Sequence, residues 1–305
     1  MEKLSNLLVV LDPTSEEQKA LLRAIEFSQK HPCKLTVFLS IYDFSYEMTT
    51  MLSSDERESM RQAVITDREE WIHELFSTLS VDPSEIDIKV VWHNRPYEAI
   101  IEQVKEHGYN LVVKGTHQHD TLKSVIFTPT DWNILRKCPC PVLLVKEHAW
   151  PANGNILAAV NAGSEEDAHQ SLNSKIIEEA QHLADIIGAK VHLVNSYPGT
   201  PVNIAIEIPE FDPQEYNASM KHHHISAVEK LATLNNIPIE NTHVVEGLPE
   251  DVIPHVSKQI DAELVVMGTI GRTGLSAALI GNTAEHVIDS LHCDVLALKP
   301  VGYNT

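Results

Sequence analysis

The chain of 305 residues is 43% hydrophobic and 22% charged, proportions typical of globular proteins, and its length fits two domains of ordinary size. Its 43 acidic and 23 basic residues give a formal net charge of −20 at pH 7. A surface this acidic repels phosphate backbones and anionic lipids, which argues against binding nucleic acid or membranes through a basic face.

The sequence shows no signal for export or membrane insertion. No apolar run approaches the ~20 residues that cross a bilayer, and residues 1–5 are not a basic segment followed by an apolar one. The 4 cysteines are too few for a disulfide framework in a chain of this length. We therefore expect a cytoplasmic protein.

Continuous apolar runs predict the strands, because a parallel sheet covered on both faces needs apolar side chains at successive positions. In the first half these runs lie near 7–12, 35–42, 87–92, 110–115 and 141–146. In the second half they lie near 156–161, 190–196, 242–246, 263–268 and 294–299.

Helices are expected between the strands. The candidate segments are 17–29, 47–79, 97–106, 164–187, 214–235, 250–259 and 283–291. Pro96 and Pro249 fit the starts of two of these helices, and Gly188 fits the end of another. The alternation of strand and helix predicts a doubly wound α/β sheet in each half, with helices on both faces.

Two segments depart from this alternation. Residues 198–213 contain four prolines and predict an extended loop, which is either a lid over a binding site or a surface excursion. Residues 147–154 also break the periodicity, and we place a domain boundary there. The predicted domains are residues 1–150 and 151–305.

The two domains are predicted to be copies of one unit. A Ser-Glu-Glu sequence follows the first strand of each, at 15–17 and 164–166. The other matching segments are LVVKGT at 111–116 with LVVMGT at 264–269, and CPVL at 140–143 with CDVL at 293–296. Matches in constant order at nearly constant separation favour duplication over a chance likeness of apolar strands.

A glycine-rich loop follows the fourth strand of the second domain. Gly268, Gly271 and Gly281 have the spacing G-x2-G-x9-G, and a polar pair then opens the next helix. Glycines let a backbone turn its N–H groups inward and approach a ligand closely. Such a loop binds phosphate oxygens, and the N-terminus of the helix favours the same negative charge.

Polar residues of this loop extend the prediction. Asn282 or Thr283 is expected to cap the helix and to donate to a phosphate, while Arg272 is expected to hold the outer phosphates. The loop lacks the G-x4-G-K-[ST] pattern of P-loop proteins and the G-x-G-x-x-G pattern of dinucleotide-binding proteins. It therefore belongs to neither of those classes.

Following a strand that ends in Met-Gly, this loop resembles the nucleotide loop of the universal stress protein family. The pattern Val-Val-x-Gly-x-Pro at 244–249 and the closing Cys-x-Val-Leu-x-Leu-Lys at 293–299 agree with that family. The resemblance covers both halves and suggests the tandem, E-type members, which fuse two such domains. It implies a five-stranded parallel sheet of order 3-2-1-4-5 in each domain, with an ATP site between strands one and four.

The resemblance also assigns nucleotide-contacting residues in the second domain. Asn161 stands where the family has Asp near the nucleoside, and Ser196 stands where the family backbone meets the adenine edge. Asn282 replaces the usual Ser or Thr after the third glycine. The full predicted set is Asn161, Ser196, Gly247, Gly268, Thr269, Gly271, Arg272, Gly281, Asn282 and Thr283.

The first domain has lost the glycine loop. In an alignment on Gly115, the second and third glycine positions hold Gln118 and Thr128, and the next residue, Pro129, has no N–H to donate to a phosphate. Asp131 adds a repelling negative charge. We therefore expect no ATP in the first domain.

The first domain is then either a structural partner of the second or a pocket adapted to another ligand. Asn94 stands where the second domain has Gly247. The bulky side chains of Phe127, Trp132 and Trp92 favour a larger and more apolar ligand than ATP.

Histidines suggest a metal site only weakly. Residues 222–224 are three consecutive histidines in an expected helix, and neighbours on a helix point about 100° apart, so the three do not face one ion. One of them with His243 or His255 is a hypothetical zinc site. The alternative is a solvated polar face.

We expect an ATP-binding stress-response protein that acts as a regulator or sensor, and no catalytic residue is assigned. One alternative is slow ATP hydrolysis or self-phosphorylation on hydroxyls of the loop, at Thr269, Thr273, Ser276 and Thr283. Another is a carrier of a non-nucleotide ligand in the first domain. A homodimer is expected, with the strands at 141–146 and 294–299 paired within one molecule.

Overall fold

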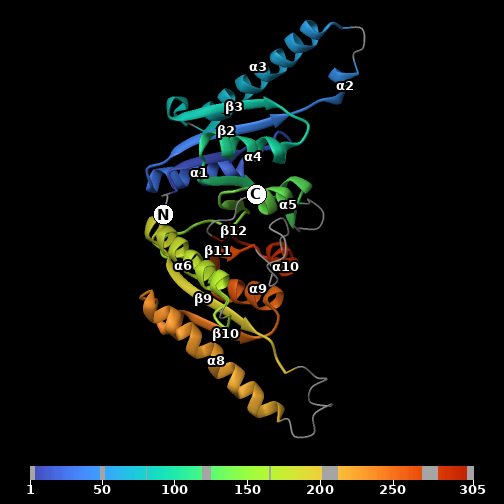
Figure 1. Ribbon diagram of the computed structural model, residues 1–305. Helices are drawn as coiled ribbons and strands as arrows, with labels where there is room; N and C mark the ends of the chain where they lie inside the picture. Colours follow the sequence, from blue (N-terminus) through green and yellow to red (C-terminus); the bar gives the residue numbers. More distant parts are fainter. Residues whose placement is uncertain are drawn as a thin grey trace. The chain divides into compact units, whose positions relative to one another are not determined.

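The computed structural model describes residues 4–48, 52–79, 81–118, 125–164, 166–200, 212–269 and 281–300. The chain divides into two compact units, unit 1 (Met1–Val145) and unit 2 (Lys146–Thr305). Figure 1 shows the helices and strands of each unit. Within the described ranges, no helix is both long enough and apolar enough to cross a membrane.

Unit 1 is built on a parallel sheet with the strand order β3-β2-β1-β4-β7. Its strands are β1 (Asn6–Val10), β2 (Lys34–Ile41), β3 (Ile86–Trp92), β4 (Leu111–Gly115) and β7 (Val142–Val145). The central strand β1 is buried at every position after Asn6, as expected of a strand covered on both faces.

The helices of unit 1 are α1 (Lys19–Lys30), α2 (Phe44–Glu47), α3 (Ser54–Leu79), α4 (Pro96–His107) and α5 (Pro129–Lys137), with a 3-10 turn at Pro83–Glu85. Helix α1 packs against β1, β2, β4 and β7, and α4 packs against β2 and α5. Helix α3 packs against the edge strand β3 (Figure 1). Its buried side chains, Ile72 and Phe76, both lie in its C-terminal half.

Unit 2 repeats this arrangement, with the strand order β10-β9-β8-β11-β12, again parallel. Its strands are β8 (Asn155–Ala159), β9 (Lys190–Tyr197), β10 (Thr242–Glu246), β11 (Ala262–Gly268) and β12 (Asp294–Leu298). Counted along the chain within each unit, both sheets have the predicted order 3-2-1-4-5, so the predicted doubly wound α/β fold is confirmed.

The helices of unit 2 are α6 (Asp167–Ile187), α8 (Pro213–Leu234), α9 (Pro249–Gln259) and α10 (Asn282–Ser290), with a 3-10 turn at Ile239–Asn241. Helix α6 packs against β8, β9, β11 and β12, and α9 packs against α10. Gly188 caps the end of α6 with a φ of +70°, and proline opens α4 and α9, as predicted.

Three details differ from the sequence analysis or lie beyond it. Helix α5 and the short antiparallel pair β5 (His117–Gln118) and β6 (Val125–Ile126) were not predicted, because they occupy a segment interpreted only as a lost loop. The helix predicted at 47–79 is observed as α3 from Ser54 to Leu79, and the short helix α2 ends at Glu47, where the predicted segment begins. Most of the proline-rich segment, residues 201–211, lies outside the described residues.

Candidate functional site

Unit 2 contains a cavity at the carboxyl ends of its central strands. It lies where β8 is flanked by β9 on one side and by β11 on the other, the point of a doubly wound sheet at which ligands bind. Helices α6, α9 and α10 supply the rest of its lining. Its volume is about 140 Å³, close to that of a cavity which takes a single aromatic ring.

Amide side chains hold the backbone that leaves β8. Asn173 of α6 accepts a hydrogen bond from the Asn161 N–H at 2.9 Å and donates one to the Asn161 carbonyl at 3.0 Å. Asn195 of β9 accepts from the N–H of Ala162 at 2.9 Å. The first turn after β8 is therefore fixed, and Asn161 lines the cavity from it.

In unit 1 an amide side chain also holds the backbone that leaves the first strand, but the following helix starts later relative to that side chain. Gln18 accepts from the Asp12 N–H at 3.0 Å and donates to the Asp12 carbonyl at 2.7 Å. Gln18 directly precedes α1, whereas Asn173 lies well inside α6, which begins at Asp167. The extra N-terminal turns of α6 bring His169 and Leu172 to the cavity wall, a contribution that unit 1 lacks.

The glycine that ends β11 lies tightly against α6. A Cβ atom on Gly268 would lie 2.5 Å from Cδ2 of Leu172, whereas the nearest atoms to a Cβ on Gly115 of unit 1 are 3.7 Å away. Gly268 therefore lets α6 pack closely on the strand end, and it also lines the cavity. Its role in the fold is separate from any contact with phosphate.

The N-terminus of α10 faces the cavity. Gly281 is the N-cap, and its carbonyl accepts from the N–H of Ala284 at 2.9 Å, so the helix starts directly after it. The predicted capping by Asn282 or Thr283 is therefore wrong, because both residues lie inside the first turn. The backbone N–H groups of Asn282 and Thr283 donate no hydrogen bond to any group in the described part of the chain, and they can therefore donate to an anion.

The loop between β11 and α10 is closed at its base. The Gly281 N–H donates to the Thr269 carbonyl at 3.3 Å. The Thr269 hydroxyl is buried and donates to the Leu298 carbonyl at 3.3 Å, and Thr116 makes the equivalent bond to Val145 in unit 1. The Thr269 hydroxyl thus joins the end of β11 to β12 in unit 2, as the Thr116 hydroxyl joins the end of β4 to β7 in unit 1. Thr269 therefore has a structural role in the sheet.

The predicted residues separate into groups. Those that line the cavity are Asn161, Ser196, Gly268, Gly281 and Thr283. Asn282 is exposed, and Gly247 forms the turn before α9 with a φ of +145°, its N–H bonded to the Tyr197 carbonyl. Neither of them lines the cavity. Gly271 and Arg272 lie outside the described residues.

Sequence reasoning missed the contribution of α6. His169, Leu172, Asn173 and Ile176 all line the cavity, at the i, i+3, i+4 and i+7 positions of one helix face. That periodicity was visible in the sequence, but it is also the pattern of an ordinary core-facing helix. Only the position of α6 over the strand ends makes this face part of a site.

The lining of the cavity is nearly free of charge. Among the described residues it contains no aspartate, glutamate, lysine or arginine, and His169 is its one titratable side chain. His169 lies 3.4 Å from the exposed carboxylate of Glu166. In a chain with a net charge of −20, the absence of carboxylates from this wall removes the main obstacle to an anionic ligand.

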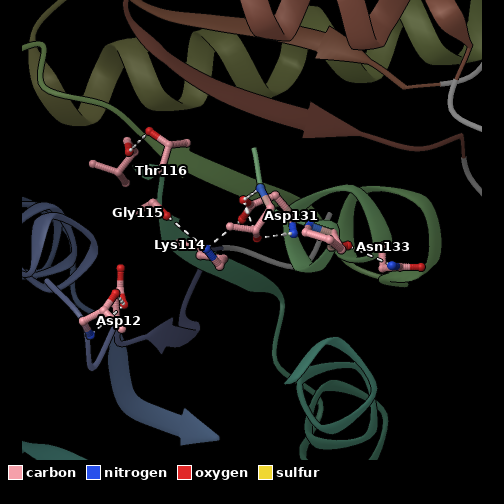
Figure 2. A network of polar contacts seen from close by, with 10 residues as sticks. Asp12, Lys114, Gly115, Thr116, Asp131 and Asn133 are labelled. Carbon is pink, nitrogen blue, oxygen red and sulfur yellow. Dashed lines mark hydrogen bonds and ion pairs between the residues drawn. The ribbon is translucent and has the colours of Figure 1, made fainter. Parts of the chain in front are cut away.

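At the corresponding place, unit 1 has the network of polar contacts that Figure 2 shows. Lys114 corresponds to Met267, because each is the residue before the last one of its strand, β4 or β11. Asp131 corresponds to Ala284, because each is the third residue of the following helix, α5 or α10. Their Nζ and Oδ1 atoms are 2.7 Å apart, and both side chains are buried. Two groups that line the cavity in unit 2 are thus replaced by a buried ion pair.

The ion pair is tied into the start of α5. The other oxygen of Asp131, Oδ2, accepts from the N–H and the hydroxyl of Thr128 at 2.6 and 2.8 Å, forming a capping box. Lys114 also donates to the Gly115 carbonyl at 3.1 Å. Asp12, at the position of Asn161, accepts hydrogen bonds from the N–H and the hydroxyl of Thr14 through Oδ1.

Two sequence interpretations of unit 1 need correction. His93, not Asn94, corresponds to Gly247, because the His93 N–H bonds to Ile41 as that of Gly247 bonds to Tyr197. The loop before Pro96 is one residue longer than its counterpart, which shifts the alignment. The predicted aromatic group is also divided: Phe127 packs on Trp132 with ring centroids 4.9 Å apart, whereas Trp92 belongs to a different cluster.

The histidines of unit 2 make contacts of their own. His224 is buried, stacks on Tyr197 and bonds to Asn195 at 2.9 Å. His243 Nε2 lies 3.1 Å from His192 Nδ1, and the rings stack. Within the described ranges, no three His, Cys, Asp or Glu side chains are grouped to hold a metal ion, so the zinc hypothesis finds no site there.

Comparison with known proteins gives consistent matches over the whole chain. The model of the universal stress protein family matches residues 3–146 and again residues 154–299. The chain is 53% identical to universal stress protein E of Escherichia coli (strain K12) over 306 residues, covering 100% of this chain and 97% of the relative. It is 43% identical to the universal stress protein E homolog of Haemophilus influenzae over 303 residues, covering 98% of each.

A solved structure is also similar over nearly its full length. It is that of a functionally unknown protein from Pseudomonas aeruginosa PAO1, with a TM-score of 0.75 and 29% identity. The match covers 99% of this chain and 94% of that one.

Proposed function

Because the chain belongs to the universal stress protein family, a family of stress-response proteins whose model matches each of its two units, we propose that unit 2 binds an adenine nucleotide in the cavity beside β8 and β11. The observation that carries this proposal is the N-terminus of α10, whose first two backbone N–H groups find no acceptor among the described residues, at a cavity whose described lining holds no carboxylate. Bound nucleotide makes the protein a regulator or sensor in a stress response.

In this proposal, the base enters the cavity near Ser196, the ribose lies near Asn161, and the phosphates extend towards Gly281 and Thr283. Gly271 and Arg272 complete the phosphate contacts from the loop. Gly247 and Thr269 act through the fold, the first by turning the chain into α9 and the second by joining β11 to β12. Asn282 contributes its backbone N–H, since its side chain is exposed.

The test is calorimetric titration of ATP into the full chain and into Met267→Lys/Ala284→Asp. This variant places the ion pair of unit 1 in the cavity of unit 2. We expect one ATP per chain for the unchanged protein and no measurable binding for the variant. The matched control, Lys114→Met/Asp131→Ala, changes unit 1 alone and is expected to keep one ATP per chain.

The outcomes separate the alternatives. No binding to the unchanged protein, or equal binding to the transplanted variant, would show the proposal to be wrong. Two ATP per chain would show that unit 1 is also a nucleotide site. Release of inorganic phosphate in the same samples tests slow hydrolysis, the enzymatic alternative.

Other expectations stay predictions. A homodimer, pairing of the strands at 141–146 and 294–299, and a cytoplasmic location follow from the family resemblance and the composition. Sedimentation equilibrium of the full chain measures the first of these directly, and a monomer mass would contradict it.

A further inference from the structure

A second cavity lies in unit 1, at the carboxyl ends of β2 and β3. It has a volume of about 1050 Å³, at the upper end of the range for small-molecule sites. Helices α2 and α3 form its outer wall. Helix α3 is anchored in the core by Ile72 and Phe76, in its C-terminal half. Residues nearer its N-terminus line the cavity.

Aromatic rings form one wall of this cavity. Trp92, the last residue of β3, has ring centroids at 5.8 Å from Tyr42 and 5.4 Å from Tyr46, at inclined angles. The Arg61 guanidinium lies 5.9 Å from the centroid of the Trp92 ring. Flat rings held in fixed orientations are suited to packing against another flat ring.

The same wall leaves much apolar surface uncovered. Tyr42 is 39% exposed, Phe44 61% and Met60 38%, and all three line the cavity. Exposed apolar side chains that gather around a hollow, rather than being scattered singly, indicate a binding surface. The apolar part of a ligand would remove this surface from water.

Some of the hydrogen-bonding groups at the cavity are donors with capacity to spare. The Asp43 carboxylate already accepts from the N–H and hydroxyl of Ser45, at 2.8 and 2.7 Å. His93 accepts from the Arg95 N–H through Nδ1 at 3.0 Å, which leaves its proton on Nε2 as a donor. The indole N–H of Trp92 is buried and finds no acceptor among the described residues.

A cation completes this set. Arg68 and Asp67 both line the cavity from α3, and the Arg68 Nε is 3.9 Å from the Asp67 carboxylate, which is 69% exposed. An exposed pair at that distance is weak, so the guanidinium keeps most of its donors for another partner. The ligand therefore needs an apolar ring and an acceptor group, and an anionic acceptor gains most from Arg68.

We propose that this cavity of unit 1 binds a planar aromatic acid. The ring packs against Tyr42, Tyr46 and Trp92, and the acid group accepts hydrogen bonds from Arg68 and His93. The site lies entirely in unit 1, so it is independent of the proposed nucleotide site in unit 2.

The test uses two fluorescent probes on the full chain, anilinonaphthalene sulfonate and the uncharged phenylnaphthylamine. We expect saturable binding of one sulfonate per chain, with higher affinity than for the uncharged probe despite the net charge of −20. Val64→Glu, which places a charge on the cavity face of α3, should weaken both probes about tenfold or more. Thr66→Glu, at an exposed position of the same helix outside the lining, should leave both unchanged.

Arg68→Gln tests the acid group separately. It should lower the affinity for the sulfonate to that for the uncharged probe and leave the uncharged probe unchanged. Thermal unfolding of each variant checks that the fold is retained.

Three results would overturn the proposal. Non-saturable binding, or equal loss in the Val64 and Thr66 variants, would mean that the probes adhere to exposed apolar surface. Tighter binding of the uncharged probe would exclude an acid as the ligand class. Competition by ATP would place the probes in unit 2, whereas failure of ATP to bind leaves this test unaffected.

Discussion

At two equivalent positions, unit 1 has a buried ion pair where unit 2 has side chains that line a cavity. Lys114 and Asp131 neutralise each other inside unit 1, where Met267 and Ala284 leave a cavity in unit 2. A buried charge is tolerated only with its partner, since removing one member leaves the other unpaired away from water. The capping box of α5 holds the Asp131 carboxylate in this position.

This reading predicts a non-additive effect on stability. Lys114→Met leaves Asp131 buried and unpaired and should lower the free energy of unfolding of unit 1 by about 3–5 kcal/mol. Lys114→Met/Asp131→Ala should cost only about 1–2 kcal/mol, chiefly because the Asp131 half of the capping box is lost. Urea unfolding of both variants measures the difference, and a double variant less stable than the single one would contradict the assignment.

At the scale of elements, the candidate site depends on where α6 and α10 begin. The early start of α6 brings its apolar face over the strand ends, and Gly268 permits its close approach. The start of α10 directly after Gly281 leaves backbone donors at the cavity. Both features concern helix boundaries, which local sequence specifies less well than the helices themselves.

The packing of α6 on β11 yields a matched test. Gly268→Ala should push Leu172 towards the cavity, at a cost of about 1–3 kcal/mol for overpacking, and should weaken ATP binding. Gly115→Ala, with ordinary contacts at 3.7 Å, should change neither stability nor binding. Calorimetry compares the ATP affinity of the two glycine variants, and thermal unfolding compares their stability. Adding Leu172→Ala to Gly268→Ala should restore ATP binding. Equal behaviour of the two glycine variants would refute the close-packing role.

At the scale of the whole molecule, two units with one topology have diverged in their polar interiors. Unit 2 holds a chain of hydrogen bonds from His243 through His192 to Asn155, with atoms 3.1 and 3.2 Å apart. The corresponding strand positions in unit 1 are Thr36 and Lys89. The two units should therefore respond differently to acid.

Burial and the neighbouring His243 lower the pKa of His192 to about 4, and burial also lowers the pKa of His243. Between pH 6.5, the ordinary pKa of histidine, and pH 4, these histidines bind protons in the unfolded chain but stay largely unprotonated in folded unit 2. The free energy of unfolding of unit 2 therefore falls as the pH drops from 6.5 towards 4. We expect a loss of about 1 kcal/mol, since partial exposure reduces the full effect of the shift.

Hydrogen exchange resolved by unit measures this effect. Protection should fall with pH in unit 2, and His192→Gln/His243→Gln should flatten that dependence. Unit 1 in the same sample is the control. An unchanged pH dependence in the histidine variant would mean that other groups cause the acid sensitivity.

The sequence by itself determined the architecture. Apolar runs that are buried on both faces specify parallel strands, and the regular alternation with helices specifies a doubly wound sheet, because few arrangements cover both faces of such a sheet. The repeated segments predicted two similar units. The glycine spacing and family resemblance pointed to the end of β11, and Gly268 and Gly281 do line the cavity there.

Only the tertiary structure decided what these positions do. Thr269 resembles a loop residue in sequence, but its hydroxyl bonds to Leu298 across the sheet. The equivalence of Gly247 with His93 instead of Asn94 is seen only in the hydrogen bond from the His93 N–H to Ile41. The start of α10 after Gly281 is likewise seen in the hydrogen bond from the Ala284 N–H to Gly281. The ion pair between Asp131 and Lys114 joins a helix residue to a strand residue, and such pairing has no local signal because it depends on how α5 packs at the end of β4.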